Sequence, residues 1–202
     1  MTIEALGLCL ARSWKTSNVC RSGLKKGAIR CFFFFNDTAT TEIYTHPIFL
    51  EHLTPPGHPE RPDRLRALEK ALADPQFDQL VRLEAPRGRE EAVLYAHPEE
   101  HMARVAMAIP ETGMRRIDDD TVVSPKSFEA AMHAIGAVTA GVDAVFRREA
   151  DNAFVAARPP GHHAEKSTAM GFCLFNHIAI AARHAQKEHG AERVAIIDWD
   201  VH

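Results

Sequence analysis

The 202-residue chain has no excess of basic charge and no long hydrophobic run. Its net charge is -3 at pH 7, so the overall charge gives no support for binding to nucleic acid or to an anionic membrane. No apolar run approaches the roughly 20 residues that cross a bilayer, and residues 32–35, all phenylalanine, are far too short. We therefore expect a soluble protein with a small or peptide-like substrate and without nucleic-acid or membrane partners.

Cysteine is also scarce. Cys9, Cys20, Cys31 and Cys173 show no CxxC pairing, and their density is below that of a secreted disulfide scaffold. The sequence therefore predicts a reducing, cytoplasmic location. A hydrophobic content of 46% is normal for a globular domain with a core.

Residues 1–43 differ in composition from the rest of the chain. Basic residues dominate up to residue 31, where Glu4 is the only acid, and a polar run follows the four phenylalanines. One interpretation is an organelle transit peptide. The other is a non-native segment, because residues 32–45 look like translated sequencing-adapter DNA. We predict that residues 1–43 are non-native or disordered and that residues 44–202 form the folded part.

Residues 44–202 alternate helical and strand patterns. Ser124 and Pro125 are suited to the cap and first turn of a long helix, and the all-apolar run after Asn152 suits a strand covered on both faces. Strand, helix and strand in this order predict a βαβ unit and a mainly parallel sheet of the α/β class. We expect helices at 61–73, 90–96, 98–108, 124–149 and 172–188, and strands at 80–83, 152–157 and 193–198.

Ligating side chains follow two of these predicted strands. His162 and His163 come after Pro-Pro-Gly, and Asp198, Asp200 and His202 close the last strand, where alternation would point all three to one side. Because the carboxyl ends of parallel strands meet at one edge, we expect the two groups to converge. A solvated strand end is the alternative for the acidic group.

The chemistry of these groups is that of a metallohydrolase. Asp200 and His202 are of the types that supply ligands to a catalytic zinc ion, which usually has three protein ligands. The paired imidazoles of His162 and His163 are suited to proton transfer near neutral pH, and Asp198 is placed to orient one of them.

The same motifs resemble the histone deacetylase superfamily. The resemblance rests on Arg-Pro-Pro-Gly-His-His at 158–163, Gly-Phe-Cys at 171–173 and Asp-Trp-Asp-Val-His at 198–202, with Gly57 to Pro62 and Asp118 to Thr121 similar to the bacterial and class II branch. It implies an arginase-like, three-layer αβα fold and zinc-dependent hydrolysis of an acetylated lysine peptide or an acetylated polyamine.

The resemblance also implies a role for each matching residue. His162 and His163 match a general base and a general acid, and Asp198 matches the carboxylate that hydrogen-bonds the first of them. Asp200 and His202 match two zinc ligands, Phe172 matches an aromatic wall of the acyl-lysine tunnel with Gly171 beside it, and a monovalent cation is expected near Asp198.

Some parts of the family pattern are not found in this sequence. The third zinc ligand, an aspartate, and the tyrosine that stabilises the oxyanion lie further along in the family, and Tyr44 and Tyr95 both precede the motifs. We therefore expect a C-terminally incomplete domain that is inactive or nearly so. The alternatives are a non-catalytic metal-binding remnant of this fold and an arginase-type dimetal hydrolase, which the histidine pair fits badly.

The remaining histidines receive no role at this stage. We expect them to be ordinary surface residues, with a reservation for His58 near the expected substrate site, and we expect no metal at His177 or His184. Cys173 is expected to pack as a small apolar group. The surface histidines in this prediction are His46, His52, His58, His97 and His101.

Overall fold

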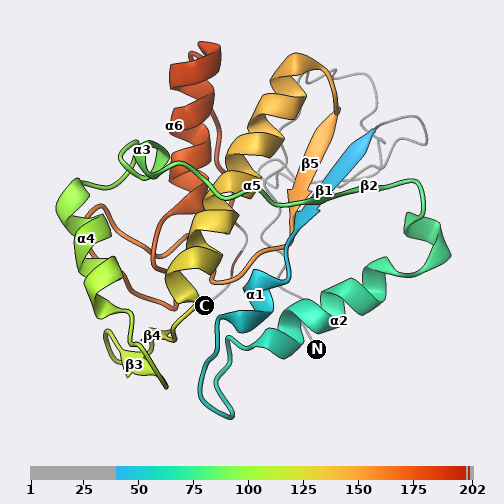
Figure 1. Ribbon diagram of the computed structural model, residues 1–202. Helices are drawn as coiled ribbons and strands as arrows, with labels where there is room; N and C mark the ends of the chain where they lie inside the picture. Colours follow the sequence, from blue (N-terminus) through green and yellow to red (C-terminus); the bar gives the residue numbers. More distant parts are fainter. Residues whose placement is uncertain (1–39, 199, 201–202) are drawn as a thin grey trace, which may run out of the picture.

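A three-stranded parallel sheet lies at the centre of the computed structural model, which describes residues 40–198 and residue 200. The central strand β1 (Thr41–Thr45) pairs with β2 (Val81–Glu84) on one side and with β5 (Asn152–Val155) on the other (Figure 1). In the register of the ladder, Tyr44 lies opposite Leu83 and Val155. The predicted strands at 80–83 and 152–157 are confirmed to within two residues at each end.

The start of β1 corrects the predicted domain boundary. Residues 41–43 lie in this central strand, and Thr41 and Ile43 are each only 3% exposed. The boundary at residue 43 therefore falls inside the fold, because the β-branched and aromatic residues of Thr-Glu-Ile-Tyr-Thr suit a strand. The prediction for residues 1–39 lies outside the described residues.

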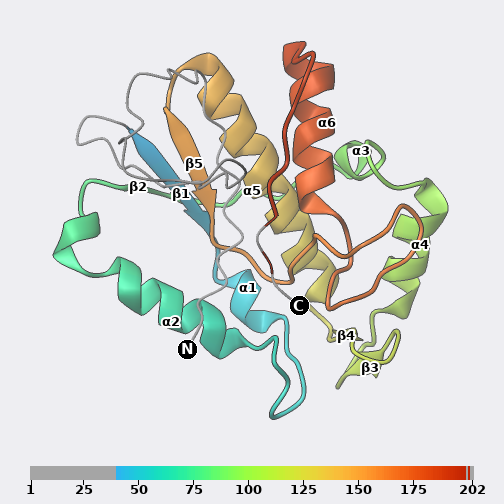
Figure 2. The same ribbon diagram turned by 180° about the vertical axis from the view of Figure 1, so that it is seen from behind.

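Two long helices, α5 (Ser127–Arg147) and α6 (His177–His189), lie side by side, as both views show (Figures 1 and 2), and α5 packs against strands β1 and β5. The apolar side of α5, with Ala137, Val138 and Val142, packs against Tyr44 and Val155 in one core cluster. Ala181 and Ala185 of α6 belong to the same cluster. The helical periodicity predicted for both segments is confirmed.

One glycine allows a loop to cross α5 at close range. A Cβ at Gly136 would lie 1.9 Å from the carbonyl oxygen of Pro86, and Gly88 donates its N–H to the carbonyl of Met132 on the same helix. Any side chain at residue 136 would therefore separate the segment after β2 from α5.

The remaining helices are shorter. The predicted helices at 61–73, 90–96 and 98–108 are confirmed as α2, α3 and α4, with α3 shorter than expected. The elements are α1 (Ile48–Glu51), α2 (Pro62–Leu72), a 3-10 turn (Pro75–Phe77), α3 (Glu90–Val93), α4 (Glu99–Ala108) and the small antiparallel pair β3 (Arg115–Arg116) and β4 (Val122–Val123). None of the helices in the described part of the chain is long and apolar enough to span a membrane.

Both long helices begin later than the sequence predicted. Ser124 does not cap α5, because its Oγ accepts the N–H of Leu53 and its own N–H is donated to Ser127 Oγ. The predicted start of α6 at residue 172 is also wrong. Asn176 caps this helix by accepting the N–H of Ala179, and Phe172 has a left-handed backbone (φ +69°) that cannot continue a helix.

The predicted strand at 193–198 is not present in the described structure. No described strand pairs with this segment, and Ile196 and Ile197 are each 53% exposed. A β-branched run forms a strand only where a neighbour accepts its main-chain hydrogen bonds, so composition alone was insufficient. The predicted βαβ unit therefore lacks its second strand here.

Candidate active site

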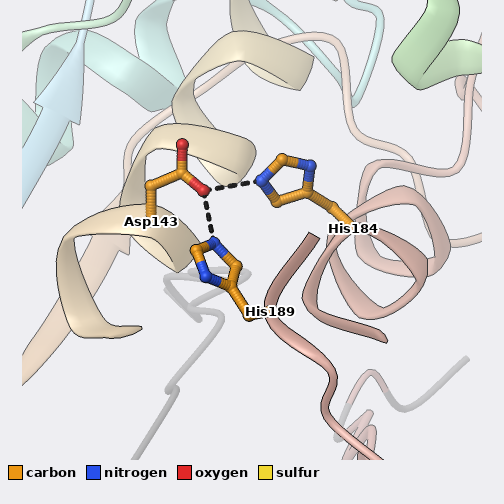
Figure 3. Close-up of side chains that lie close together, drawn as sticks. All are labelled: Asp143, His184 and His189. Atoms are coloured by element: carbon orange, nitrogen blue, oxygen red, sulfur yellow. Dashed lines mark hydrogen bonds and ion pairs between the residues drawn. The ribbon is translucent and has the colours of Figure 1, made fainter. Parts of the chain in front are cut away.

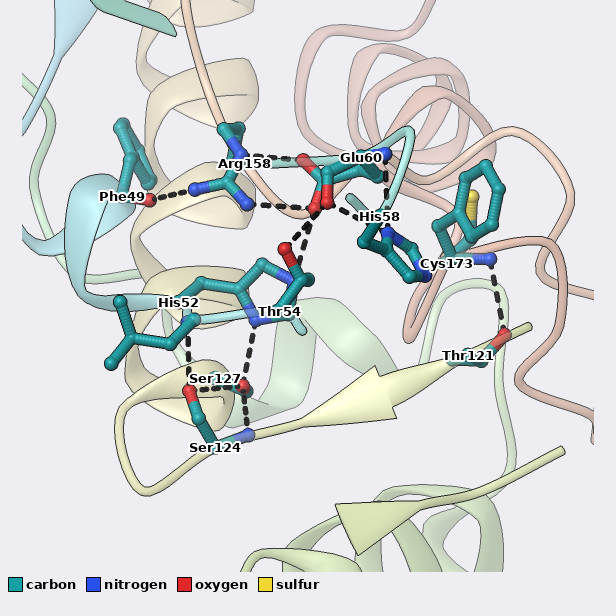
Figure 4. Close-up of polar contacts among 12 residues, drawn as sticks. Phe49, His52, Thr54, His58, Glu60, Thr121, Ser124, Ser127, Arg158 and Cys173 are labelled. Atoms are coloured by element: carbon teal, nitrogen blue, oxygen red, sulfur yellow. Dashed lines mark hydrogen bonds and ion pairs between the residues drawn. The ribbon is translucent and has the colours of Figure 1, made fainter. Parts of the chain in front are cut away.

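The chain between β5 and the tandem histidines is held by a buried ion pair. Arg158 donates to both oxygens of Glu60, from Nε to Oε1 and from Nη2 to Oε2 at 2.7 Å, and both charged side chains are buried (Figure 4). It also donates from Nη1 to the carbonyl of Phe49 at 2.9 Å. This bidentate contact fixes the loop 156–163 to the loop that carries Glu60.

The ion pair belongs to a wider buried network. His52 places Nε2 3.4 Å from Glu60 Oε2 and Nδ1 2.7 Å from Ser127 Oγ. Burial alone would raise the pKa of Glu60, but hydrogen bonds from His52 and Arg158 lower it to about 2. Burial lowers the pKa of His52. Glu60 is therefore an anion within the fold.

The prediction that His52, His97 and His101 are surface residues is wrong. Each is at most 2% exposed. His97 contacts the carbonyl of Lys166 and accepts the N–H of Asn176, and His101 contacts the carbonyl of Leu174. These histidines therefore support the segment that follows the tandem pair.

The rings of His162 and His163 lie close together, and Asn176 and Gly171 contact this segment. Their centroids are 4.0 Å apart at an angle of 50°. Asn176 donates from Nδ2 to the carbonyls of His162 and Ala164 at 3.2 and 3.0 Å. A Cβ at Gly171 would lie 2.7 Å from the His163 ring, so glycine is required there for this approach.

The carboxylates of the last described residues meet this pair. Asp198 Oδ2 lies 3.0 Å from His162 Nδ1, and Asp200 Oδ2 lies 3.3 Å from His162 Nε2 and 3.8 Å from His163 Nε2. Burial would raise the pKa of Asp198, but the N–H of Asp200 and the His162 ring hold it below its usual value. The predicted convergence of the two groups is thus observed, whereas His202 lies outside the described residues.

The donor set fits a divalent ion. One ligand atom each from His162, His163 and Asp200 lies within 4.8 Å of the others. Imidazole nitrogen and carboxylate oxygen are the ligands that zinc accepts alongside thiolate. The sequence predicted Asp200 and His202 as metal ligands. Asp200 is the member of that pair that belongs to this set.

Gly171 and Phe172 lie beside the tandem histidines. Phe172 donates its N–H to Thr121 Oγ1 at 3.0 Å, and its ring packs edge-on against His58 with centroids 5.0 Å apart. His58 in turn contacts the carbonyl of Asp120 at 3.0 Å. The next residue, Cys173, is buried, and burial raises the pKa of its thiol to about 12. Its Sγ donates to the carbonyl of Gly171 at 3.2 Å, so the thiol is buried as expected but also makes a polar contact.

Several residues that position the site were not singled out from the sequence. Glu60 and Arg158 lie within the motifs at 57–62 and 158–163, and nothing in either motif indicates that the two residues pair. Asn176 was placed inside a helix that in fact it caps. For Thr121, whose hydroxyl accepts a backbone N–H from residue 172, no local pattern gives a signal.

A parallel sheet with helices places the chain among α/β domains, and two imidazoles and two carboxylates gather near the end of β5. The profile of the histone deacetylase domain matches residues 58–202, and the chain belongs to this family. The sheet and helices agree with the three-layer α/β fold of that family.

Three similar proteins illustrate the relationship. The chain is 36% identical over 181 residues to a histone deacetylase-like amidohydrolase of Pseudomonas aeruginosa, covering 86% of this chain and 47% of that protein. It is 36% identical over 149 residues to the human polyamine deacetylase HDAC10, covering 71% of this chain and 22% of that protein. The crystal structure of the HDA15 HD domain superposes with a TM-score of 0.76 at 34% identity, covering 82% of this chain and 48% of that one.

The first curated relatives are longer than this chain. The chain covers 51%, 47% and 45% of three of them, and so spans about half of their length.

Proposed function

We propose that this protein is a zinc-dependent amide hydrolase that releases acetate from acetyl-lysine peptides or acetylated polyamines. The observation that carries the proposal is the meeting of Asp200 with His162 and His163, at 3.3 and 3.8 Å, in a member of the histone deacetylase family. Similar proteins named as a polyamine deacetylase and a histone deacetylase-like amidohydrolase support the substrate class. A cytoplasmic protein without nucleic-acid or membrane partners is part of the proposal.

The roles of the residues follow from their contacts. Asp198 accepts from His162 Nδ1, so Nε2 of that ring faces Asp200 and is free to take a proton from water as general base. His163, whose side chain is 35% exposed, delivers a proton to the leaving amine as general acid. When bound, zinc polarises the acetyl carbonyl and lowers the pKa of water. Asp200 and His202 are its proposed ligands.

Substrate and cation positions complete the proposal. Phe172 and Gly171 border the acyl chain beside His163, since Gly171 lies against that ring and Phe172 is held by Thr121. A monovalent cation lies near Asp198. These assignments rest on the family resemblance together with the placement of Gly171 and Phe172 next to the tandem pair.

We also propose that residues 1–202 alone are inactive or nearly so. The chain spans about half of its relatives, and the resemblance places the third zinc ligand and the oxyanion tyrosine beyond residue 202. Loss of one oxyanion donor alone typically lowers the rate about a hundred- to a thousandfold.

The test compares residues 1–202 with the translation of the uninterrupted reading frame that contains them. Acetate release is measured from an acetyl-lysine peptide and from an acetylated polyamine, with and without a chelator. We expect zinc-dependent hydrolysis by the longer protein, a fall of about 10²–10⁴ in kcat for His162→Ala, and no turnover by residues 1–202. Equal rates for the longer protein and its His162→Ala variant would reject the catalytic assignment, and turnover by residues 1–202 would reject the second proposal.

The alternatives give different results in the same assay. Zinc binding without acetate release by the longer protein would favour a non-catalytic metal-binding remnant. Two ions bound within the cluster of His162, His163 and Asp200 would favour an arginase-type dimetal hydrolase instead.

A further inference from the structure

A second group of metal-ligating side chains lies between α5 and α6, separate from the candidate active site. Asp143 of α5 faces His184 and His189 of α6 (Figure 3). Its Oδ1 lies 2.7 Å from His184 Nε2 and 2.6 Å from His189 Nε2. All three ligand atoms lie within 4.8 Å of one another. The sequence analysis expected no metal at His184, because the partner on α5 was not visible from spacing within one helix.

The two imidazoles are fixed by aromatic rings on their other sides. Phe146 stacks on His189 with centroids 4.5 Å apart and 12° between the planes, and Tyr95 stacks on His184 at 6.2 Å and 26°. His184 Nδ1 is buried without a hydrogen-bond partner among the described residues, so Nε2 is the nitrogen that makes the polar contact. The stacked rings restrict the orientations of the two imidazoles.

The Asp143 carboxylate presents one oxygen, Oδ1, to both imidazoles. Arg147 lies 3.6 Å from Oδ2, the oxygen that does not face the imidazoles. The side chains of Asp143 and His189 are 27% and 17% exposed, which leaves an approach from solvent.

The distances between the ligand atoms are close to those around a bound zinc ion. Bonds of about 2.0–2.1 Å at a tetrahedral zinc ion separate neighbouring ligand atoms by about 3.3 Å. The observed separations from Asp143 Oδ1 to the two imidazole nitrogens are 2.7 and 2.6 Å, so each of these two pairs would widen by less than about 1 Å to hold an ion.

We propose that Asp143, His184 and His189 form a second divalent-cation site, of the class that binds zinc, which joins α6 to α5. Two imidazoles and one carboxylate are a ligand set that zinc uses. His189 is the last residue of α6, and the chain then leads through Gly190 to Asp198 and Asp200. An ion at this site would therefore fix the point from which the segment with the active-site carboxylates leaves the helix.

The test measures metal binding in a background that removes the active-site cluster. The 202-residue chain carrying His162→Ala and Asp200→Asn is freed of metal and titrated with Zn²⁺ by calorimetry and with Co²⁺ by visible absorption. We expect one saturable equivalent, and a rise in the melting temperature on adding Zn²⁺. Adding Asp143→Asn or His189→Gln should weaken binding at least roughly tenfold, since loss of an outer-shell partner alone costs about 10–100-fold.

The controls separate a lost ligand from a damaged fold. His133→Gln removes another α5 histidine, whose Nδ1 contacts the carbonyl of Ala85, and should leave the titration unchanged. Far-UV circular dichroism of the metal-free variants checks that each is folded. The proposal is overturned if the background chain binds no Zn²⁺ saturably, or if folded Asp143→Asn and His189→Gln variants bind it as tightly as the background.

Discussion

Replacing Glu60 by glutamine should destabilise the fold by several kcal/mol, because it leaves the Arg158 guanidinium buried without a counter-charge. Breaking a buried ion pair by removing one partner costs about 3–5 kcal/mol. The pKa of Glu60 gives an independent figure. It falls from 4.5 to about 2, and each unit is worth about 1.4 kcal/mol, so the carboxylate contributes about 3 kcal/mol at neutral pH.

The contribution of Glu60 to the unfolding free energy should change with pH in a defined direction. Because the folded-state pKa of Glu60 is depressed, its contribution is fully present above pH 4.5 and is lost as the pH falls toward 2. The difference in unfolding free energy between the wild type and Glu60→Gln should therefore be about 3 kcal/mol at pH 7 and should shrink across that window. Urea unfolding followed by far-UV circular dichroism at several pH values measures both quantities.

A matched control is available at an exposed pair. Glu129 accepts from Arg87 Nε at 3.0 Å, and its side chain is 42% exposed, so Glu129→Gln should cost at most about 1 kcal/mol. If Glu60→Gln fails to fold, the double variant Glu60→Gln with Arg158→Met should restore part of the stability, since no buried charge remains. A Glu60→Gln variant as stable as Glu129→Gln, or a difference that does not change between pH 4.5 and 2, would refute the reasoning.

Two further substitutions test how the tandem histidines are held. Gly171→Ala combines a left-handed backbone with a Cβ 2.7 Å from the His163 ring, whereas the control Gly113→Ala has a left-handed backbone (φ +70°) and no atom within 4 Å of its Cβ. Gly171→Ala should therefore lower the unfolding free energy by about 1–3 kcal/mol more than Gly113→Ala, as measured by urea unfolding. It should also shift the His163 ring resonances in NMR spectra. Equal costs for the two variants would contradict the close approach. Asn176→Ala should lose about 1 kcal/mol for the α6 cap and about 1 kcal/mol for each bond to the carbonyls of His162 and Ala164, while Asn176→Asp should recover only the cap. Asn176→Asp and Asn176→Ala variants of equal stability would show that the cap contributes nothing.

The amphipathic helices and the buried strands were predictable because their signals are local. The apolar spacing of α5 and the all-apolar run of β5 are set by which residues face the core. The first residues of the helices were less predictable. Both Ser124 and Asn176 have side chains that can cap a helix, and tertiary contacts decide which of them does so. Ser124 bonds to Leu53 and Ser127, so that only Asn176 acts as a cap.

The candidate site shows the same division. The convergence of His162 and His163 with Asp198 and Asp200 was predicted from two motifs expected after strands of one parallel sheet, and it is observed although the second strand is not present in the described structure. The supporting residues were not, since Glu60 lies about a hundred residues before Arg158 and neither spacing nor composition joins them. The cluster of Asp143 with His184 and His189 was missed for the same reason, because it depends on how α5 packs against α6.

The two halves of the candidate site differ in what holds them. His162 and His163 follow a strand of the sheet and are supported by the buried Arg158 pair and by Asn176. Asp198 and Asp200 follow residues 191–197, which join no described strand, and the Asp198 side chain is 48% exposed. An exposed ion pair contributes at most about 1 kcal/mol, whereas ordering each residue of such a segment costs about 1–2 kcal/mol. The exposed contact of Asp198 with His162 therefore does not by itself order this segment, and main-chain pairing or an ion bound near Asp200, whose side chain is 13% exposed, would stabilise it further.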